Sequence, residues 1–320
     1  MRLLLAPMQG VVDHHFRELY ARLGGLDHCV SEFVRVNDSV VPKRSLRMQC
    51  QELNNTKPGY TLTGLPVRLQ LLGSNPDTMA ASAVNACELG APGIDLNFGC
   101  PAKTVNNSRG GAVLLQDTKL VHRIVASVRT AVPKHIPVTA KIRLGFNDRS
   151  GYLDNARAIV EAGATELCVH ARSRVDAYNP PAYWNHIAEI RSEVPIPVVA
   201  NGEIWSAADW RLCQQQSQCT DFMLGRGIMA RPDLALQIRA AAQSSESRPM
   251  TWQDVQRLVY EYYLGTKDLY PQRHLGNRVK QWMYYLQMAF PEAAAFFEEI
   301  KRHRTQAEFE RSFAPCQLAA

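Results

Sequence analysis

Four polar side chains lie inside or at the end of otherwise apolar runs of this 320-residue chain: Gln70, Asn97, Lys141 and His170. Burying such groups costs free energy unless each one finds a partner. A buried lysine needs an anion or a lowered pKa, so it is a stronger functional signal than the other three. A single glutamine or histidine in a strand usually only bonds within the core. If the four runs end on the same side of one sheet, however, these side chains converge on a site that could bind a polar ligand and stabilise negative charge.

Cys100 follows the run that contains Asn97, in the sequence Phe98-Gly99-Cys100-Pro101. A thiol with an ordinary pKa of about 8.5 is mostly protonated at neutral pH, so Cys100 could act as a general acid. The polar, basic stretch over residues 102–111 that follows it is expected to form a mobile lid rather than packed structure. The chain has eight cysteines without a C-x-x-C pair or a Cys/His cluster at zinc spacing, so we expect no metal site and no disulfide framework.

Two glycine-containing turns close the last two apolar runs, Asn201-Gly202-Glu203 and Gly225-Arg226-Gly227. Glycines let backbone N–H groups approach a ligand closely, and an arginine offers a fork of donors suited to phosphate. Two ordinary turns would also explain the pattern. We favour a phosphate-bearing cofactor, because loops in this position form phosphate sites in parallel barrels.

The elements that would position these residues are short strands alternating with helices. Apolar runs typical of strands covered on both faces occupy residues 3–7, 29–34, 67–72, 94–97, 138–144, 166–170, 198–201 and 222–224. Helical patterns alternate with them over residues 13–23, 76–89, 117–131, 152–162, 183–194 and 206–216. This order predicts a (β/α)8 TIM barrel with its site at the carboxyl ends of the strands, and an insertion between residues 34 and 67. A doubly wound sheet would need a G-x-G-x-x-G turn after an early strand, and the sequence has none.

The composition and the hydrophobic pattern of the chain change after residue 242. Residues 243–249 are polar and resemble a linker, and helical patterns follow over residues 252–264, 274–289 and 292–303. We therefore predict a barrel domain over residues 1–242 and a small all-helical domain over residues 243–320.

The charge is mildly basic, with 36 basic and 30 acidic residues and a formal net charge of +6. This balance permits a polyanionic partner without requiring one. No apolar run reaches the length of a membrane span, and the apolar stretch near the N-terminus is too short for a secretory signal. We expect a cytoplasmic monomer that does not bind membranes.

The motifs at the strand ends resemble, in order, those of the tRNA-dihydrouridine synthases. They are Ala6-Pro7-Met8, Asp95-Leu96-Asn97-Phe98-Gly99-Cys100-Pro101, Lys141-Ile142-Arg143-Leu144-Gly145, His170-Ala171-Arg172, Asn201-Gly202-Glu203-Ile204 and Gly225-Arg226-Gly227. Residues 32–36 and 278–282 are similar to subfamily C, whose members act on uridine 16. Gln9, where that subfamily has an acidic residue, and Phe98, where the family often has a small residue or cysteine, depart from the pattern.

The resemblance implies reduction of uridine 16 in the D-loop of tRNA to 5,6-dihydrouridine, with FMN bound and NADPH as reductant. A hydride would reach C6 of the base, Cys100 would give a proton to C5, and Asn97 would contact the base. The residues implied to bind FMN are Pro7, Met8, Gln9, Gln70, Lys141, His170, Asn201, Gly202, Glu203, Gly225 and Arg226. Those implied to contact tRNA are Arg35, Tyr178, Arg278, Lys280 and Tyr285.

Residues 269–291 contain no acidic residue, and their basic and aromatic side chains suit an RNA surface. Helical periodicity places Arg278 and Tyr285 on one face and Lys280 nearly opposite. Three alternatives remain open: the same reaction at another tRNA uridine, an FMN enzyme acting on a free pyrimidine, and a non-catalytic RNA-binding protein. The basic helical tail speaks against the second, and the third leaves Lys141, His170 and Cys100 unexplained.

Overall fold

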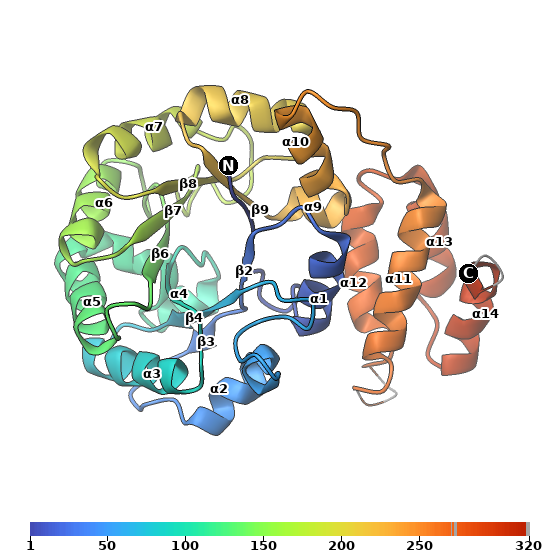
Figure 1. Cartoon of the computed structure of the whole chain (residues 1–320), viewed down its shortest axis with the longest axis horizontal. Coiled ribbons are helices and arrows are strands. Elements are labelled where there is room, and N and C mark those ends of the chain that lie inside the picture. Colours follow the sequence, from blue (N-terminus) through green and yellow to red (C-terminus); the bar gives the residue numbers. More distant parts are fainter. Residues whose placement is uncertain (270, 272–273, 318–320) are drawn as a thin grey trace.

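A closed barrel of parallel strands forms the first three-quarters of the chain in the computed structural model, which describes residues 1–269, 271 and 274–317. The barrel closes because β1 pairs with both β2 and β9, while β2 pairs with β4 across the insertion. Helices surround it (Figure 1), so the predicted (β/α)8 fold is confirmed.

The strands are β1 (Leu3–Leu5), β2 (His28–Val30), β3 (Val34–Arg35), β4 (Val67–Leu72), β5 (Ile94–Phe98), β6 (Val138–Arg143), β7 (Glu166–His170), β8 (Val198–Asn201) and β9 (Asp221–Leu224). The helices of this part are α1 (His14–Leu23), α2 (Lys43–Gln49), α3 (Pro76–Glu88), α4 (Lys103–Asn107), α5 (Thr118–Ala131), α6 (Tyr152–Glu161), α7 (Trp184–Glu193), α8 (Ala207–Ser217), α9 (Arg226–Ala230) and α10 (Leu234–Ala242), with 3-10 helices η1 (Gln51–Asn54) and η2 (Gly111–Gln116).

The strands bury both faces, which explains their continuous apolar sequence. In β1, Leu3 and Leu5 belong to the large core beneath the helices, whereas Leu4 belongs to a separate small cluster with residues of other strands. That cluster fills the barrel interior with Leu4, Ala6, Val30, Cys168, Val199 and Met223. The barrel interior is therefore filled with side chains, and a cavity opens where loops follow the strands.

The run over residues 29–34, predicted as one strand, is two. Val30 pairs with Arg68 and Val34 pairs with Leu71, so this segment holds one residue more than its partner and forms a bulge. Inside the bulge, the Ser31 hydroxyl accepts the Gln70 amide at 3.0 Å and so takes the place of a backbone carbonyl. The insertion predicted between residues 34 and 67 is present, and it contains α2 and η1, which the sequence did not predict.

The expectation that residues 102–111 form a lid without packed structure is wrong. This segment contains α4, in which Val105 and Asn106 are buried. The Asn106 side chain donates to the carbonyls of Cys100 and Ala102 and accepts from the Val113 amide. One asparagine thus fastens the segment to the turn that carries Cys100, and a polar composition concealed this role.

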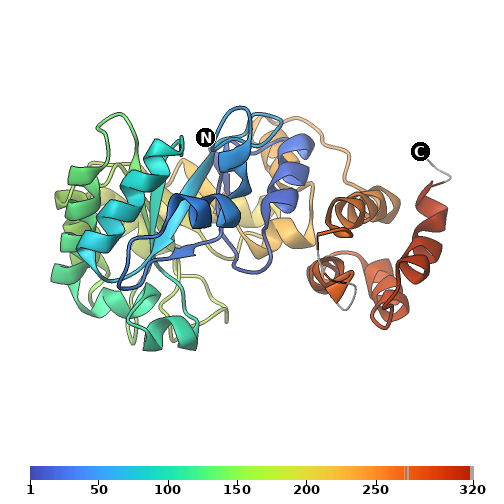
Figure 2. The same cartoon turned by 90° about the horizontal axis from the view of Figure 1, so that it is seen from below.

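In the described residues after the barrel, the chain forms four α-helices: α11 (Trp252–Thr266), α12 (Asn277–Leu286), α13 (Pro291–Ile300) and α14 (Gln306–Gln317). The sequence predicted the first three and missed α14. They gather on one side of the barrel in both views (Figures 1 and 2), with α11 and α12 closest to it. Phe16 of α1 contacts Tyr262 of α11 and Trp282 of α12, with ring centroids 5.6 and 5.0 Å apart. Among the described helices, none is both long and apolar enough to cross a bilayer.

Candidate active site

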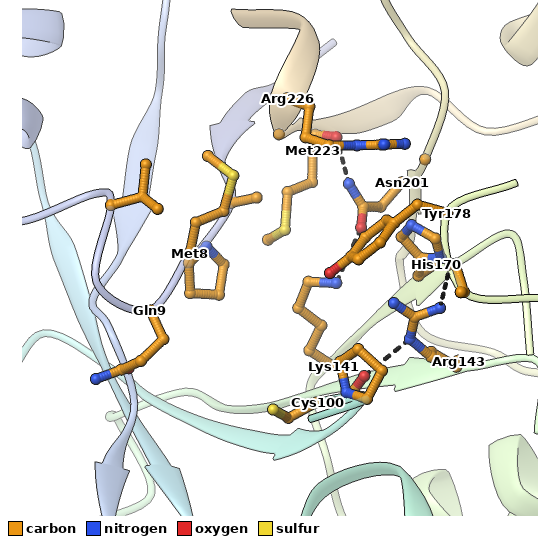
Figure 3. A pocket seen from close by; sticks show the side chains of 18 of the residues that line it. Met8, Gln9, Cys100, Lys141, Arg143, His170, Tyr178, Asn201, Met223 and Arg226 are labelled. Atoms are coloured by element: carbon orange, nitrogen blue, oxygen red, sulfur yellow. Dashed lines mark hydrogen bonds between the residues drawn. The ribbon is translucent and has the colours of Figure 1, made fainter. Parts of the chain in front are cut away.

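A cavity of about 920 Å³ opens at the carboxyl ends of the barrel strands. Of the residues that the sequence singled out, those lining it are Pro7, Met8, Gln9, Gln70, Asn97, Cys100, Lys141, His170, Tyr178, Asn201, Gly202, Glu203, Gly225, Arg226 and Tyr285. Met8 and Gln9 lie on one side of the cavity, and Lys141, Arg143 and His170 lie on the other (Figure 3). The convergence expected of four separate strands is therefore present in three dimensions.

A directed chain of hydrogen bonds leads to the turn that carries Cys100. The side-chain oxygen of Asn97, Oδ1, accepts hydrogen bonds from the backbone amides of Gly99 (3.0 Å) and Cys100 (2.9 Å). Because backbone amides can only donate, these bonds identify that atom as the oxygen of the amide group. Asn97 then donates through Nδ2 to Gln70 Oε1 at 2.8 Å, and Gln70 donates through Nε2 to Asp95 Oδ2 at 2.7 Å. Each bond fixes the orientation of the next amide, so buried Asp95 anchors the whole chain.

The Cys100 side chain is half-buried at the cavity wall. Burial raises the pKa of its thiol, while the nearby Arg143, Arg35 and Lys141 oppose that shift. A raised thiol pKa keeps the proton on sulfur at neutral pH. The group is thus suited to giving a proton to a ligand rather than to attacking it as a thiolate.

Lys141 brings its ammonium group into the same cavity from β6. Its Nζ donates to Asn201 Oδ1 at 2.9 Å, and Asn201 donates onward to the Met223 carbonyl at 2.8 Å. Burial lowers the Lys141 pKa. Because an ammonium has three donors, the bond to Asn201 leaves donors that can reach a ligand in the cavity.

His170 ends β7 with a ring that is 8% exposed, and its Nδ1 has no hydrogen-bond partner among the described residues. Burial, reinforced by Arg143, Lys141, Arg172 and Arg226, lowers the His170 pKa well below its ordinary value. This shift favours the neutral ring. His170 lines the cavity, so its imidazole can form a hydrogen bond with a polar ligand there.

The turns after β8 and β9 form a corner suited to an anion. Gly202 (φ 110°) and Glu203 (φ 60°) both adopt positive φ, and α9 begins at Arg226 without a side-chain cap. The free amides of a helix start and the Arg226 guanidinium fit a phosphate group. Arg226 is held by Glu203 at 3.3 Å and lies 4.6 Å above the Tyr178 ring.

Arg143 also lines the cavity; the sequence placed it in a strand-end motif but gave it no role. Its Nε donates to the Gly99 carbonyl at 2.9 Å, and its Nη1 donates to the carbonyls of Ser173 and Ala177. It thereby ties the Cys100 turn to the loop that carries Tyr178. Strand periodicity could have found it, because Arg143 follows Lys141 by two residues and so shares its side of the strand. Tyr284 and Met288 at the rim were also missed, since a helical pattern does not tell which face meets a cavity.

Three expected tRNA contacts lie outside this cavity: Arg35, Arg278 and Lys280. Arg35 ends β3, half-buried. The Lys280 Nζ donates to the His303 carbonyl at 2.8 Å, within the C-terminal helices. Arg278 donates to the Gly10 carbonyl beside the cavity. Helical periodicity predicted that Lys280 lies on the opposite face of its helix from Arg278 and Tyr285. In the structure Lys280 bonds to His303, whereas Arg278 and Tyr285 lie beside or in the cavity wall. The contact of these residues with RNA stays a prediction.

Comparisons with known proteins find one family that matches nearly the whole chain. A family model described as Dihydrouridine synthase (Dus) matches residues 4–319. A tRNA-dihydrouridine(16) synthase of Pseudomonas putida is 48% identical over 311 residues, which cover 97% of this chain and 96% of the relative. One of Shewanella oneidensis is 47% identical over 322 residues, covering 99% and 98%.

Solved structures resemble the chain more distantly. An old yellow enzyme homologue from Zymomonas mobilis matches with a TM-score of 0.50 at 12% identity, over 79% of this chain and 91% of that one. Histamine dehydrogenase from Rhizobium sp. 4-9 matches with a TM-score of 0.58 at 12% identity, over 82% and 48%. At such identities the likeness supports the barrel fold alone.

Proposed function

The chain belongs to the dihydrouridine synthase family, and from that premise we propose that it reduces a uridine of tRNA to 5,6-dihydrouridine, with FMN as resident cofactor and NADPH as reductant. We take the target to be uridine 16, because the relatives that match over nearly their whole length are tRNA-dihydrouridine(16) synthases. One observation carries the proposal: the thiol of Cys100 and the amino group of Lys141 line one cavity at the end of the barrel.

The residues present fit a flavin mononucleotide. At about 920 Å³ the cavity is near the upper end of the ~300–1,000 Å³ typical of small-molecule sites, which leaves room for a cofactor and a base. The phosphate would lie against Gly202, Gly225 and Arg226, where the uncapped start of α9 provides donors. The imidazole of His170, which lines the cavity, and the spare donors of Lys141 provide partners for the polar edge of a flavin ring.

Bound FMN would supply the hydride that saturates the uracil ring. The residues of the chain then have to place a proton on C5 and stabilise negative charge while it develops. Cys100 holds the proton, because burial keeps its thiol neutral. Asn97 fixes the two amides of the Cys100 turn, so the sulfur is held in place before the substrate arrives. Lys141 adds a positive charge in a largely desolvated position, where such a charge acts most strongly.

The uridine must leave the RNA stack to reach the cavity, which favours an unpaired loop nucleotide. Tyr178, which is 48% exposed, and Tyr284, which is 56% exposed, stand at the rim with Met288. Aromatic side chains in this position can stack against an extruded base or its neighbours. This rim supports tRNA over a free pyrimidine as the substrate.

The test uses purified enzyme, NADPH and an unmodified tRNA transcript. We expect a visible flavin spectrum, dihydrouridine formation on the transcript, and none when uridine 16 is replaced by cytidine. Free uridine should not be reduced at comparable concentration. Reduction at a different uridine would support the proposed reaction but contradict uridine 16 as its target. Turnover of free uridine would favour an enzyme that acts on a free pyrimidine. Anaerobic bleaching of the flavin by NADPH and by NADH compares the two reductants directly.

A further inference from the structure

The loop between β1 and α1 carries three of the proposed FMN contacts, Pro7, Met8 and Gln9, and is held at the peptide groups of the next residue, Gly10. The Gly10 amide donates to Glu32 Oε1, and the Gly10 carbonyl accepts from Arg278 Nη1. Gly10 has a positive φ of 77°, a conformation that leaves the loop little intrinsic preference. Backbone hydrogen bonds from the Val11 and Val12 amides to the Met8 carbonyl, both 3.0 Å long, close the turn. The side chains of Glu32, from the barrel, and Arg278, from the C-terminal helices, fasten this turn to its surroundings.

Arg278 is well placed to hold the loop because its own helix is fixed to the barrel. It lies in the first turn of α12, whose Trp282 is 1% exposed and donates through Nε1 to the Met229 carbonyl at 3.0 Å. The guanidinium also faces Asp13, with Nε 3.8 Å from Oδ2. Asp13 in turn caps α1 by accepting the Phe16 amide at 2.9 Å and receives the Tyr262 hydroxyl at 3.0 Å.

The charges around Arg278 support the same role. Glu32 and Asp13 both lie near the loop, and the Arg278 guanidinium can bond the Gly10 carbonyl while it offsets part of their negative charge. A charge-assisted hydrogen bond to a backbone carbonyl is also directional, unlike the contact of a lysine. The side chain thus joins the C-terminal helices to a loop that faces the cofactor cavity.

We propose that Arg278 is a positioning residue that holds the loop over residues 7–10 against the cofactor, so that the C-terminal helices contribute to retention of FMN. This inference rests on the proposed function, since FMN is the ligand whose binding reports it. It is separate from any contact that Arg278 makes with tRNA.

The experiment removes FMN from the full chain and titrates it back, following the quenching of flavin fluorescence without tRNA or NADPH. We expect Arg278→Ala to weaken FMN binding by about tenfold or more, as loss of a charged hydrogen bond predicts. The FMN affinity of Arg278→Lys should lie between those of the wild type and of Arg278→Ala. Lys280→Ala is the matched control, because Lys280 lies in the same helix but bonds to His303 away from the loop, and its FMN affinity should equal that of the wild type.

A second variant guards against simple misfolding. Glu32→Gln weakens the other anchor of the same residue, Gly10, so its effect on FMN affinity should be less than additive with that of Arg278→Ala. Wild-type affinity in a folded Arg278→Ala protein, or full additivity of the two changes, would overturn the inference. If the wild type itself binds no FMN, the proposed function fails, which is a separate result.

Discussion

Cys100 is the residue on which the proposed chemistry depends most directly. We expect Cys100→Ala to keep bound flavin and lower turnover of tRNA by about 10²–10⁴-fold, the usual contribution of a general acid. Single-turnover reduction of the transcript measures this change. Cys87→Ala is the matched control, because Cys87 is also half-buried but lies on α3 outside the cavity. Turnover by Cys100→Ala equal to that of the control would remove the thiol from the mechanism.

The pH dependence follows from the same thiol. The protonated form is the active one, and burial raises its pKa against the opposing charges of Arg143, Arg35 and Lys141. The single-turnover rate should therefore persist as pH rises through the ordinary thiol range near about 8.5 and decline only above it. The residual rate of Cys100→Ala should lack this alkaline decline. A wild-type rate that instead rises with pH through this range would show that the sulfur acts as a thiolate.

Individual side chains were predictable where their type was unusual for their place. A lysine in an apolar strand, a histidine at a strand end and glycines after the last strands all signalled the cavity from sequence. Arg143 was hidden because it also reads as an ordinary residue at the end of a strand. The bonds of Arg278 to Gly10 and of Lys280 to His303 depend on how α12 meets the barrel and the other helices, which no local pattern encodes.

The strands and helices were predictable because their hydrophobic patterns are local. Parallel strands buried on both faces give continuous apolar runs, and helix starts such as Asn75-Pro76 carry their own capping signals. The bulge between β2 and β3 was missed because it depends on the Ser31 hydroxyl reaching the Gln70 amide of another strand. The packing of α4 was missed because it depends on a single polar residue, Asn106.

The insertion after β3 is attached to α1 by a buried ion pair. Arg17 lies 2.7 Å from Glu52 through Nε and Oε1, and the two side chains are 1% and 3% exposed. Burial raises the Glu52 pKa, but Arg17 outweighs this and lowers it to about 2. Because the folded pKa is below the ordinary value, the pair stabilises the fold fully above about pH 4.5 and loses this contribution as pH falls toward about 2.

We expect Glu52→Gln to destabilise the protein by about 3–5 kcal/mol, since it leaves a buried guanidinium without its anion. Urea unfolding at neutral pH measures the loss, and the difference from the wild type should shrink in acid. Glu193→Gln removes the exposed partner of Arg157 and should change stability little. If the two substitutions cost the same, the buried pair has no special role in holding the insertion.

The barrel and the C-terminal helices meet through an aromatic seam made of Phe16, Tyr20, Tyr262 and Trp282. The division into domains between residues 242 and 243 remains a prediction. The aromatic seam determines whether the two predicted domains unfold separately or together. Trp282 contacts all three other rings and is almost fully buried, so it contributes most to the contact. A seam of this kind should make the two parts unfold together.

Calorimetry of the full chain should therefore give one unfolding transition, and Trp282→Ala should lower the stability by about 3–5 kcal/mol and separate the transition into two. Trp252→Ala is the control, because Trp252 contacts Phe290 and Phe296 within the C-terminal helices. It should lower the single transition without dividing it. Two transitions in the wild type would mean that the seam does not couple the parts. In that case the anchoring of the β1–α1 loop by Arg278 could persist only while the helices stay docked, and FMN should be lost with the first transition.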